Sequence, residues 1–484
     1  MTINDKFDRA KAIIQRLIQE EKYEDALQLI SSQADIMYTY NQWYTDDDLE
    51  KLLYDIENTL SVDAVIDSVG ENTVFYYDAF GLNNRGLTQI YLAALLKLNF
   101  HIVYVTILEA KGNIPTIESL LNIGNGEVVY LASASSSYRV ANYRALCSII
   151  ARVNPYYAFL YTTPSDVSGI MAFQHFAGQM QRYQINLTDH TFWLGRNAFD
   201  YCLEFRNYGA SISVKYRQIL ANKLLKQPYY PIVNQNILFE GFPFERTADD
   251  FIIFSGGSIY KTVDKAHTYY RLIEYCLQKF SQVKFWYASN DDNVELVDLM
   301  KRYPTRVYHT RERQDLFQIM KNIDMYLNTY PVSGGLMVQY AALAKKAPLT
   351  LVHDDDAKGI LIGQENLDIE FYMIDDFKKE VVRYIEDKDY RDKKDARMDN
   401  AIISASEFTE NLSRIMQTST SAYPIKCIDI DTMIFRQNYR EKFGEYGFEM
   451  ALVKRNNLRF MRYFPAMFVK GIMFKLIKKF KQRV

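Results

Sequence analysis

The sequence has only four cysteines among 484 residues, and no two of them form a CxxC pair. Their wide spacing suggests neither a disulfide framework nor a zinc site, which favours a reducing compartment. The N-terminus, MTINDKFDRAK, is too polar for a secretory signal, and no stretch approaches the ~20 consecutive apolar residues of a membrane span. We therefore expect a cytoplasmic protein. The cysteines are Cys147, Cys202, Cys276 and Cys427.

Acidic residues are missing from the stretch 454–484, which carries ten Lys or Arg although the whole chain has a net charge of only −2. A nucleic-acid-binding protein more often carries its positive charge on a folded face, so no nucleic-acid partner is expected. Bulky apolar residues alternate with the cations and would enter lipid while the lysines meet anionic headgroups. Residues 455–484 are thus predicted to bind the inner face of the plasma membrane; a helix packed on the protein is the alternative. The apolar residues are Phe468, Ile472, Phe474, Ile477 and Phe480.

Short apolar runs alternate with helical patterns along most of the chain, as in TVFYYDAF (73–80) followed by LTQIYLAALLKL (87–98). Unbroken apolar strands between helices indicate a parallel sheet covered on both faces. The alternation stops in the turn-rich stretch 226–245 and then starts again. The predicted fold class is therefore α/β with two facing Rossmann-like domains. Ligands are expected at the carboxyl ends of their strands, in the cleft between the domains.

This pattern divides the chain into four predicted parts. Residues 1–65 read as short amphipathic helices, which we interpret as a small helical cap; a tetratricopeptide-like module for a protein partner is the alternative. The two Rossmann-like domains are expected over 66–240 and 241–415. Return helices and the basic amphipathic tail would follow over 416–484. The sequence leaves open whether the chain forms a homo-oligomer.

Two glycine turns follow strands in the second half. The first is Ser255-Gly256-Gly257, with Lys261 shortly after it, and the second is Ser333-Gly334-Gly335, just before a helix. Glycine lets the backbone approach a ligand closely, and the N–H groups at a helix start attract anions. A serine there can act as both N-cap and phosphate donor. Glycine can also serve the turn geometry alone, but two turns and a lysine favour diphosphate binding. No GxxxxGK[ST] motif occurs, so ATP hydrolysis is not supported.

At these residues the chain resembles GT-B glycosyltransferases of bacterial capsular, exopolysaccharide or other surface-glycan biosynthesis. The resemblance covers roughly residues 70–415. Its last segment is also distantly similar to the nucleotide-binding turn of the protein O-GlcNAc transferase group, although an Ala-Gly pair of that group is Ala344-Lys345 here. The segments that carry the resemblance are NLTDHTFWLGRNAFDYCLEFRNYGAS (186–211), FSGGSIYK (254–261), RVYHTRERQDLFQIM (306–320) and TYPVSGGLMVQYAALAKKAPLTL (329–351).

The resemblance implies a donor site in the C-terminal domain. Such enzymes transfer sugar from a nucleotide sugar, here expected to be UDP-linked, without a metal or another cofactor. The diphosphate would meet the glycine turns and the lysine, the base would lie near a strand end, and a helix glutamine would reach the ribose. The implied donor contacts are Ser255, Gly256, Gly257, Lys261, Tyr308, His309, Thr310, Ser333, Gly334, Gly335 and Gln339.

The N-terminal domain would hold the acceptor and, if the reaction inverts, a base for the acceptor hydroxyl. An Asp-His pair ends one predicted strand there, and polar residues fill the first turn of the domain. Many retaining members of this group place an E-x7-E pair in the region of the glycine turns, and no matching pair is found there, so the stereochemistry stays open. The acid run 354–356 is interpreted as a solvated loop, not as a metal motif. The expected catalytic residues are Asp189, His190 and Lys261, and the expected acceptor contacts are Asn83, Asn84 and Arg85.

The sequence thus predicts transfer of a sugar from a nucleotide sugar to a glycan or polyprenyl-linked acceptor at the cytoplasmic membrane face. One alternative is a teichoic-acid-type phosphotransferase that uses a CDP-polyol, although the paired histidines usual in such enzymes are missing. A nucleotide-sugar epimerase is a second alternative, but it has little use for a cationic tail. A third is a non-catalytic scaffold with degenerate glycine turns.

Overall fold

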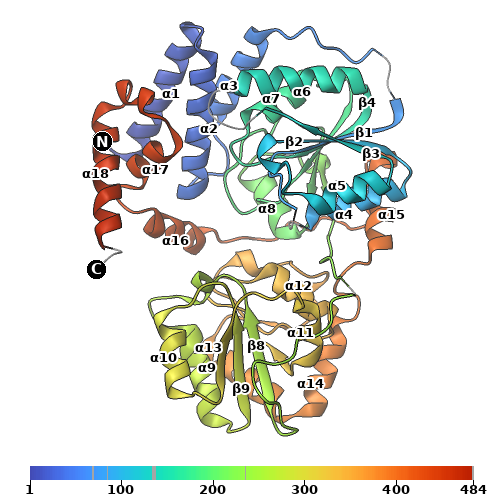
Figure 1. The fold of residues 1–484 in the computed structure, drawn as a ribbon, viewed down its shortest axis with the longest axis vertical. Helices are drawn as coiled ribbons and strands as arrows, with labels where there is room; N and C mark the ends of the chain where they lie inside the picture. Colours follow the sequence, from blue (N-terminus) through green and yellow to red (C-terminus); the bar gives the residue numbers. More distant parts are fainter. Residues whose placement is uncertain (68–69, 84–85, 133–137, 235, 482–484) are drawn as a thin grey trace. The chain divides into compact units, whose positions relative to one another are not determined.

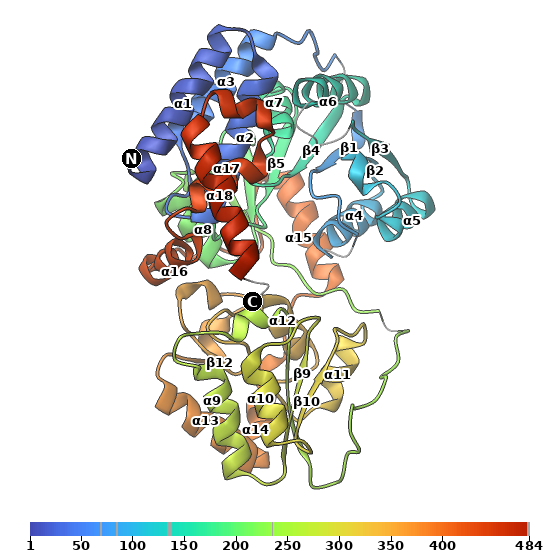
Figure 2. The same cartoon turned by 60° about the vertical axis from the view of Figure 1, so that its left-hand side comes forward.

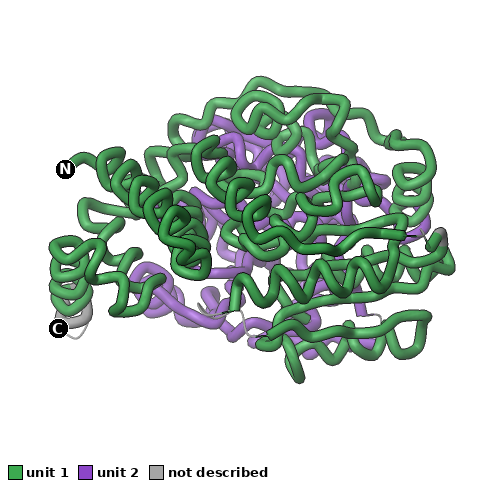
Figure 3. The backbone as a smooth tube through the Cα atoms, turned by 90° about the horizontal axis from the view of Figure 1, so that it is seen from above, with its two compact units in different colours: residues 1–227, 408–484 green, residues 228–407 purple. Residues whose placement is uncertain are grey.

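The computed structural model contains two compact units, which are coloured separately in Figure 3. Unit 1 comprises Met1–Gln227 and Phe408–Val484, and unit 2 comprises Pro228–Glu407. The N-terminal helices and the C-terminal tail therefore belong to the same unit as the first Rossmann-like half. The chain leaves unit 1 before the domain boundary expected at 240/241. The residues that the structure describes are 1–67, 70–83, 86–132, 138–234 and 236–481.

Unit 1 is built on a parallel seven-stranded sheet with the order β3-β2-β1-β4-β5-β6-β7. Figures 1 and 2 label its strands β1 to β4. The first six strands follow the order of a Rossmann fold, in which the strand order reverses between β1 and β4. Residues 74–77 of β1 are buried, as their unbroken apolar run predicts. The strands are β1 (Gly70–Asp78), β2 (His101–Thr106), β3 (Gly126–Tyr130), β4 (Pro155–Tyr161), β5 (Gln181–Ile185), β6 (Tyr201–Glu204) and β7 (Leu224–Lys226).

Helices cover both faces of this sheet, because alternate side chains of each strand point to opposite sides. Phe75 of β1 packs in one hydrophobic cluster with side chains of α6 and α7 such as Phe173. On the other face Tyr76 stacks near Phe159, which also contacts Tyr91 of α4. The helices that follow the strands are α4 (Leu87–Lys97), α5 (Pro115–Ile123), α6 (Arg139–Val153), α7 (Val167–His175) and α8 (Asn207–Lys215), and α15 (Ala405–Thr418) joins unit 1 later in the chain.

The two ends of the chain pack together within unit 1. Figure 2 shows α1, α2, α17 and α18 as neighbours, and α17 contacts both α2 and α18. Phe7 of α1 lies edge-on to Phe448 of α17, with 5.1 Å between the ring centroids. A capping box between Thr2 and Asp5 begins α1. The helices are α1 (Ile3–Gln19), α2 (Tyr23–Tyr40), α3 (Asp47–Leu60), α16 (Met433–Phe443), α17 (Gly447–Arg455) and α18 (Pro465–Lys481).

The first part of the predicted tail is core rather than membrane surface. Phe468 is fully buried in the hydrophobic cluster that contains α1 and α2, and Phe474 stacks on Tyr446. Of the predicted lipid-facing residues, Ile472 and Ile477 are exposed, whereas the side chain of Phe480 lies outside the described set. The interpretation therefore fails for Phe468, because an aromatic side chain between cations can equally face the protein. Among the described residues, no helix combines the length and the apolar character needed to cross a bilayer.

Glu50 of α3 is a buried carboxyl that tethers the helical cap to the loop after β5. Its Oε1 accepts hydrogen bonds from the N–H of Gly195 at 2.8 Å and of Arg196 at 3.4 Å. Its Oε2 has no partner among the described residues. Burial, only partly offset by these N–H groups, raises the pKa of Glu50 from 4.5 to about 7.

We expect Glu50→Gln to stabilise the protein above neutral pH. The folded state holds the Glu50 proton more tightly than the unfolded state between pH 4.5 and about 7. Stability contributed by this proton is complete below that window and is lost as pH rises through it, by about 3 kcal/mol in total. The amide keeps the Oε1 acceptor without the charge. Urea unfolding at pH 5 and pH 8 should show a gain for Glu50→Gln at pH 8 only, and none for the exposed control Glu21→Gln. If wild type and Glu50→Gln have the same free energy of unfolding at pH 5 and also at pH 8, the raised pKa of Glu50 is contradicted.

Unit 2 repeats the topology of unit 1 on a smaller scale. Its main parallel sheet has the order β10-β9-β8-β11, and β12 pairs with β13. A parallel bridge between Leu327 and Leu349 joins the chain after β11 to the chain before β12. Numbered from β8, the order is again that of a Rossmann fold, with the reversal between β8 and β11. The strands are β8 (Phe251–Gly256), β9 (Val283–Ala288), β10 (Val307–Thr310), β11 (Met325–Tyr326), β12 (Thr350–Leu351) and β13 (Glu370–Phe371); the helices are α9 (Thr268–Lys279), α10 (Val294–Arg302), α11 (Leu316–Asn322), α12 (Gly335–Leu343), α13 (Ile374–Glu386) and α14 (Lys388–Asp395).

Candidate functional site

Both glycine turns of unit 2 lie at the carboxyl ends of the neighbouring strands β8 and β11. These are the strands between which the strand order reverses, and open α/β sheets bind ligands at that point. The structure therefore brings the turns 255–257 and 333–335 together, as the sequence predicts. A Cβ added to Gly256 would lie 3.3 Å from Cε of Met337, which belongs to the helix after the second turn.

The first turn needs glycine for its backbone conformation. Gly257 has a φ of +112°, a conformation that favours glycine. Its N–H donates to the Ala288 carbonyl at 3.0 Å, and its own carbonyl accepts from the Tyr287 hydroxyl at 3.1 Å. Ser255 is fully buried within β8, so its side chain lies beneath the turn and not on its surface.

The second turn is organised by Asn328, a buried residue that the sequence analysis did not single out. Its Oδ1 accepts from the N–H of Gly334 at 3.0 Å, and its Nδ2 donates to Oγ of Ser333 at 2.6 Å. The helix α12 begins at Gly335 with Gly334 as N-cap, and no side chain caps it. The expectation that Ser333 caps this helix is therefore wrong, because Asn328 engages its hydroxyl. The N–H groups of the first turn of α12 have no acceptor within the helix.

Lys261 links the two turns. It lies in a short 3-10 helix (Ile259–Thr262) after β8, and its Nζ donates to the carbonyl of Ser333 at 3.4 Å. Its own carbonyl accepts from the N–H of Val332 at 3.3 Å. None of the described carboxylates forms an ion pair with it. Burial lowers the pKa of Lys261, an effect that the charge of Asp356 only partly offsets.

The other predicted donor contacts form a separate group or lie inside the protein. Tyr308, His309 and Thr310 belong to β10, two strands away from β8. The Tyr308 hydroxyl donates to the Thr305 carbonyl at 2.6 Å, His309 Nε2 lies 3.1 Å from Oγ of Ser289, and Oγ1 of Thr310 accepts from the Trp286 indole at 2.9 Å. Gln339 is almost fully buried in α12, and its amide donates to the Tyr229 carbonyl at 3.4 Å.

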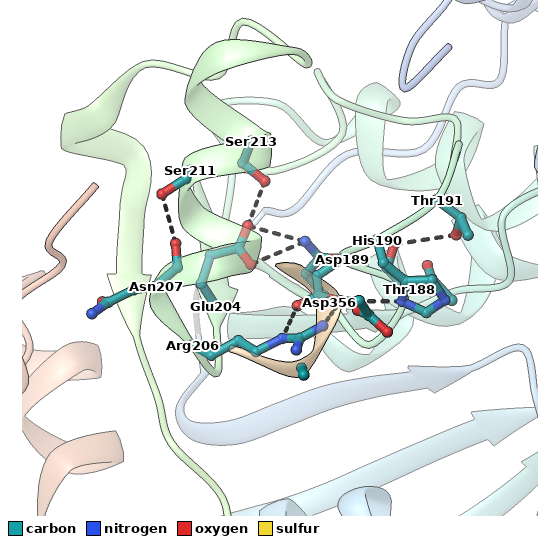
Figure 4. Close-up of polar contacts among 12 residues, drawn as sticks. Thr188, Asp189, His190, Thr191, Glu204, Arg206, Asn207, Ser211, Ser213 and Asp356 are labelled. Carbon is teal, nitrogen blue, oxygen red and sulfur yellow. Dashed lines mark hydrogen bonds and ion pairs between the residues drawn. The ribbon is translucent and has the colours of Figure 1, made fainter. Parts of the chain in front are cut away.

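In unit 1 Asp189 and His190 follow β5 at the carboxyl edge of the sheet (Figure 4). Asp189 is fully buried and accepts two hydrogen bonds from Arg206, at 2.6 Å from Nε and 3.0 Å from Nη2. Nδ1 of His190 lies 3.2 Å from Oδ1 of Asp189. Burial raises the pKa of Asp189, but the charge of Arg206 and these hydrogen bonds outweigh it and hold the pKa well below its usual range. Asp189 is thus a fixed anion that orients His190 rather than a base itself.

The loop that carries Asp189 and His190 is held by a second buried arginine. Nη2 of Arg217 donates to the carbonyls of Asp189 at 2.8 Å and Thr191 at 2.6 Å, and the guanidinium lies over the Trp193 ring. Glu204 of β6 is buried nearby and accepts from Ser213 at 2.5 Å, as Figure 4 shows. Neither arginine was identified from the sequence, because an isolated arginine gives no sign that it is buried.

The predicted acceptor contacts begin with Asn83, which has a structural task. Its Oδ1 accepts from the N–H of Thr116 at 2.8 Å and of Ile117 at 3.3 Å, so it caps the start of α5. Its Nδ2 donates to the Thr116 hydroxyl at 2.9 Å. Asn84 and Arg85 lie outside the described residues.

Comparisons with known proteins add the fold family. No protein-family model matches the sequence, and no curated protein matches it. A mutant of the O-GlcNAc transferase of Thermobaculum terrenum is similar in structure, with a TM-score of 0.52, 11% identity and coverage of 90% of this chain and 82% of that one. A glycosyltransferase from Rickettsia africae has a TM-score of 0.54, 11% identity and coverage of 72% and 100%. The fold is GT-B. The predicted fold class is thereby confirmed, and each unit supplies one of the two Rossmann-like halves of a GT-B chain.

Proposed function

We propose that this GT-B protein is a glycosyltransferase that binds a nucleotide sugar at the β8–β11 switch point of unit 2. The observation that carries the proposal is the meeting of Lys261 with the turn before α12, 3.4 Å from Nζ to the Ser333 carbonyl. Lys261 forms no ion pair with a described carboxylate, and no side chain caps the start of α12, so both can accept a further negative charge. The diphosphate of a nucleotide sugar would supply it.

The same groups suit the chemistry of sugar transfer. Negative charge grows on the departing nucleoside diphosphate as the bond to the sugar breaks. Fixed N–H groups and the Lys261 ammonium stabilise that charge without moving, which is the most effective form of electrostatic catalysis. We propose that they act in place of a metal ion, and that the nucleotide is UDP.

On the acceptor side we propose His190 as the base that takes the proton of the attacking hydroxyl. Asp189 holds the Nδ1 side of the ring, which favours the tautomer with a proton on Nδ1 and a basic Nε2. Arg206 keeps Asp189 ionised, and Arg217 fixes the loop backbone. The acceptor is proposed to be a glycan or a lipid-linked sugar.

Thermal unfolding with a panel of nucleotides tests the donor site. At about 100 times its Kd, UDP or a UDP-sugar should stabilise unit 2 by about 2.7 kcal/mol, which raises its melting temperature by roughly 5–10 °C. Stabilisation by CDP-glycerol and not by UDP would favour the polyol-phosphotransferase alternative. An unchanged melting temperature with every nucleotide would leave a scaffold and would overturn the proposal.

We also propose that the protein binds the inner face of the plasma membrane through the exposed half of α18. Five apolar side chains recur there at i, i+3, i+4, i+7 and i+8, between 37% and 55% exposed, with Lys470 and Lys475 beside them. Three arginines of the earlier tail are instead paired within unit 1, Arg455 with Asp35 and both Arg459 and Arg462 with Asp25. The apolar residues are Val469, Ile472, Met473, Leu476 and Ile477.

Flotation with phosphatidylglycerol vesicles tests this surface. The double variant Met473→Asp/Leu476→Asp should reduce membrane partitioning by about 100-fold or more, since each buried apolar side chain contributes roughly 1.5–3 kcal/mol. The control Val294→Asp changes an apolar side chain of unit 2 that is 85% exposed and should float like wild type. Equal flotation of the double variant and wild type would rule out α18 as the anchor.

A further inference from the structure

Unit 1 contains a cavity of about 470 Å³ at the carboxyl ends of β1 and β4, the switch point of its own sheet. Ala79, just after β1, and Thr163, just after β4, form its floor. The volume falls within the ~300–1,000 Å³ of small-molecule sites. The cavity has no part in the donor site of unit 2.

Helices outside the Rossmann fold close this cavity. Gln28 and Asp35 line it from α2, and Lys454 and Arg455 line it from α17. Gln28 ties these two helices together, because its Nε2 donates to the Arg455 carbonyl at 2.7 Å. Both ends of the chain therefore contribute to a single wall.

The two acids of the wall are already engaged. Asp35 accepts from the Ser165 hydroxyl at 3.0 Å and lies 3.2 Å from Nη1 of Arg455. Asp166 caps α7 by accepting from the N–H of Gly169 at 3.2 Å. Asp35 and Asp166 thus bring two negative charges to a cavity lined by three cations, one of which is Arg455.

The other two cations are paired less closely than Arg455. Arg139 begins α6, and its buried Nη1 has no hydrogen-bond partner among the described residues. It forms a long ion pair with Glu24, at 4.0 Å. Burial lowers the pKa of Arg139, an effect that the charges of Glu24, Asp166 and Asp35 only partly offset. Lys454 is exposed and makes no ion pair with a described residue. An anion bound in the cavity would pair with the positive charges of both Arg139 and Lys454.

The wall also offers an unused acceptor. Gln28 is 2% exposed, and its Oε1 has no partner among the described residues although its Nε2 is bonded. A buried acceptor without a donor destabilises the folded protein, so a ligand hydroxyl there would be favourable. A ligand that carries both an anionic group and a hydroxyl would therefore match the groups that line this cavity.

We propose that this cavity binds a phosphate group carried on a hydroxylated skeleton, with Arg139 and Lys454 on the phosphate and Gln28 Oε1 on a hydroxyl. Such chemistry occurs in free sugar phosphates and in the headgroups of phosphorylated lipids. The site needs no sugar transfer to be tested, because binding is measured directly.

Isothermal titration of the full chain compares four probes: glucose 6-phosphate, glucose, inorganic phosphate and the soluble lipid dihexanoylphosphatidylglycerol. Glucose 6-phosphate should bind at least ~10-fold more tightly than glucose, since charge-assisted hydrogen bonds to the phosphate dominate. Lys454→Gln should weaken it by about 5–10-fold, and Arg139→Gln by more. The control Lys51→Gln removes an exposed lysine of α3 and should bind like wild type.

The relative affinities of the probes identify the source of the phosphate. A tighter fit of the lipid probe assigns the cavity to a lipid headgroup, and a tighter fit of glucose 6-phosphate assigns it to a free sugar phosphate. Gln28→Leu should reduce the advantage of glucose 6-phosphate over inorganic phosphate. If Lys454→Gln binds every phosphate probe as Lys51→Gln does, or if no phosphate probe binds, the proposal is overturned. Lys454 is exposed and unpaired, so its variant is expected to fold even if Arg139→Gln does not.

Discussion

Replacing Lys261 with alanine is expected to lower the rate of sugar transfer by about 100-fold or more, the usual cost of removing one fixed donor from a developing anion. The ammonium lies against the Ser333 carbonyl and is partly desolvated, so its charge would act on a bound diphosphate through little water. Initial rates of nucleoside diphosphate release, with the nucleotide sugar that stabilises the protein most, measure this loss.

The control for this experiment is Lys301→Ala, which removes an exposed lysine of α10 in the same unit. Its rate and its melting temperature should match wild type. Lys261→Arg keeps the charge and should recover part of the activity, which a purely structural role would not require. Full activity of a folded Lys261→Ala protein would show that the turns bind no reacting diphosphate.

The second large effect is expected on stability, from Asp189→Asn. The change removes the negative charge that accepts two hydrogen bonds from the Arg206 guanidinium, whose side chain is 3% exposed. Breaking a buried pair in this way costs about 3–5 kcal/mol. Because the pKa of Asp189 is depressed, the pair contributes its stability above the ordinary carboxyl pKa and loses it only as pH falls through the lowered value. Urea unfolding of the full chain near neutral pH therefore measures the whole effect.

A matched change on the surface separates burial from pairing. Asp376 pairs with Lys379 at 2.9 Å, but both side chains are more than 60% exposed. Asp376→Asn should leave the unfolding midpoint almost unchanged, because exposed ion pairs contribute little. Equal midpoints for Asp189→Asn and Asp376→Asn would mean that Arg206 finds another partner and that Asp189 does not fix the loop.

The sequence predicts the sheets well because their strands are marked by unbroken apolar runs. The apolar run at 73–80 predicts a strand that forms most of β1, and the strand predicted before the first glycine turn is β8. The sequence does not predict β7, because its three residues, Leu224–Lys226, are too few to show a pattern of apolar side chains. Local pattern is thus enough for the repeated Rossmann halves, while short edge elements depend on the tertiary structure.

The candidate site was less predictable because its organising residues are single polar side chains. The Asn328 amide donates a hydrogen bond to the hydroxyl of Ser333, and the Arg206 guanidinium donates to the carboxylate of Asp189. Sequence reasoning places Ser333 and Asp189 at strand ends but cannot see a partner brought close by the fold. The basic tail shows the same limit, since Asp25 of α2 pairs with Arg459 and Arg462 from the far end of the chain.

Unit 2 interrupts unit 1 in the chain, and this order governs how the protein can be made. Residues 228–407 can leave the ribosome and fold as the complete unit 2 before the ribosome has synthesised α15 to α18 of unit 1. Phe448 and Phe468 then complete a core whose first half, including Phe7, was synthesised more than four hundred residues earlier. A nascent chain stalled before α17 would therefore expose that apolar surface and become a chaperone substrate, although unit 2 is already folded.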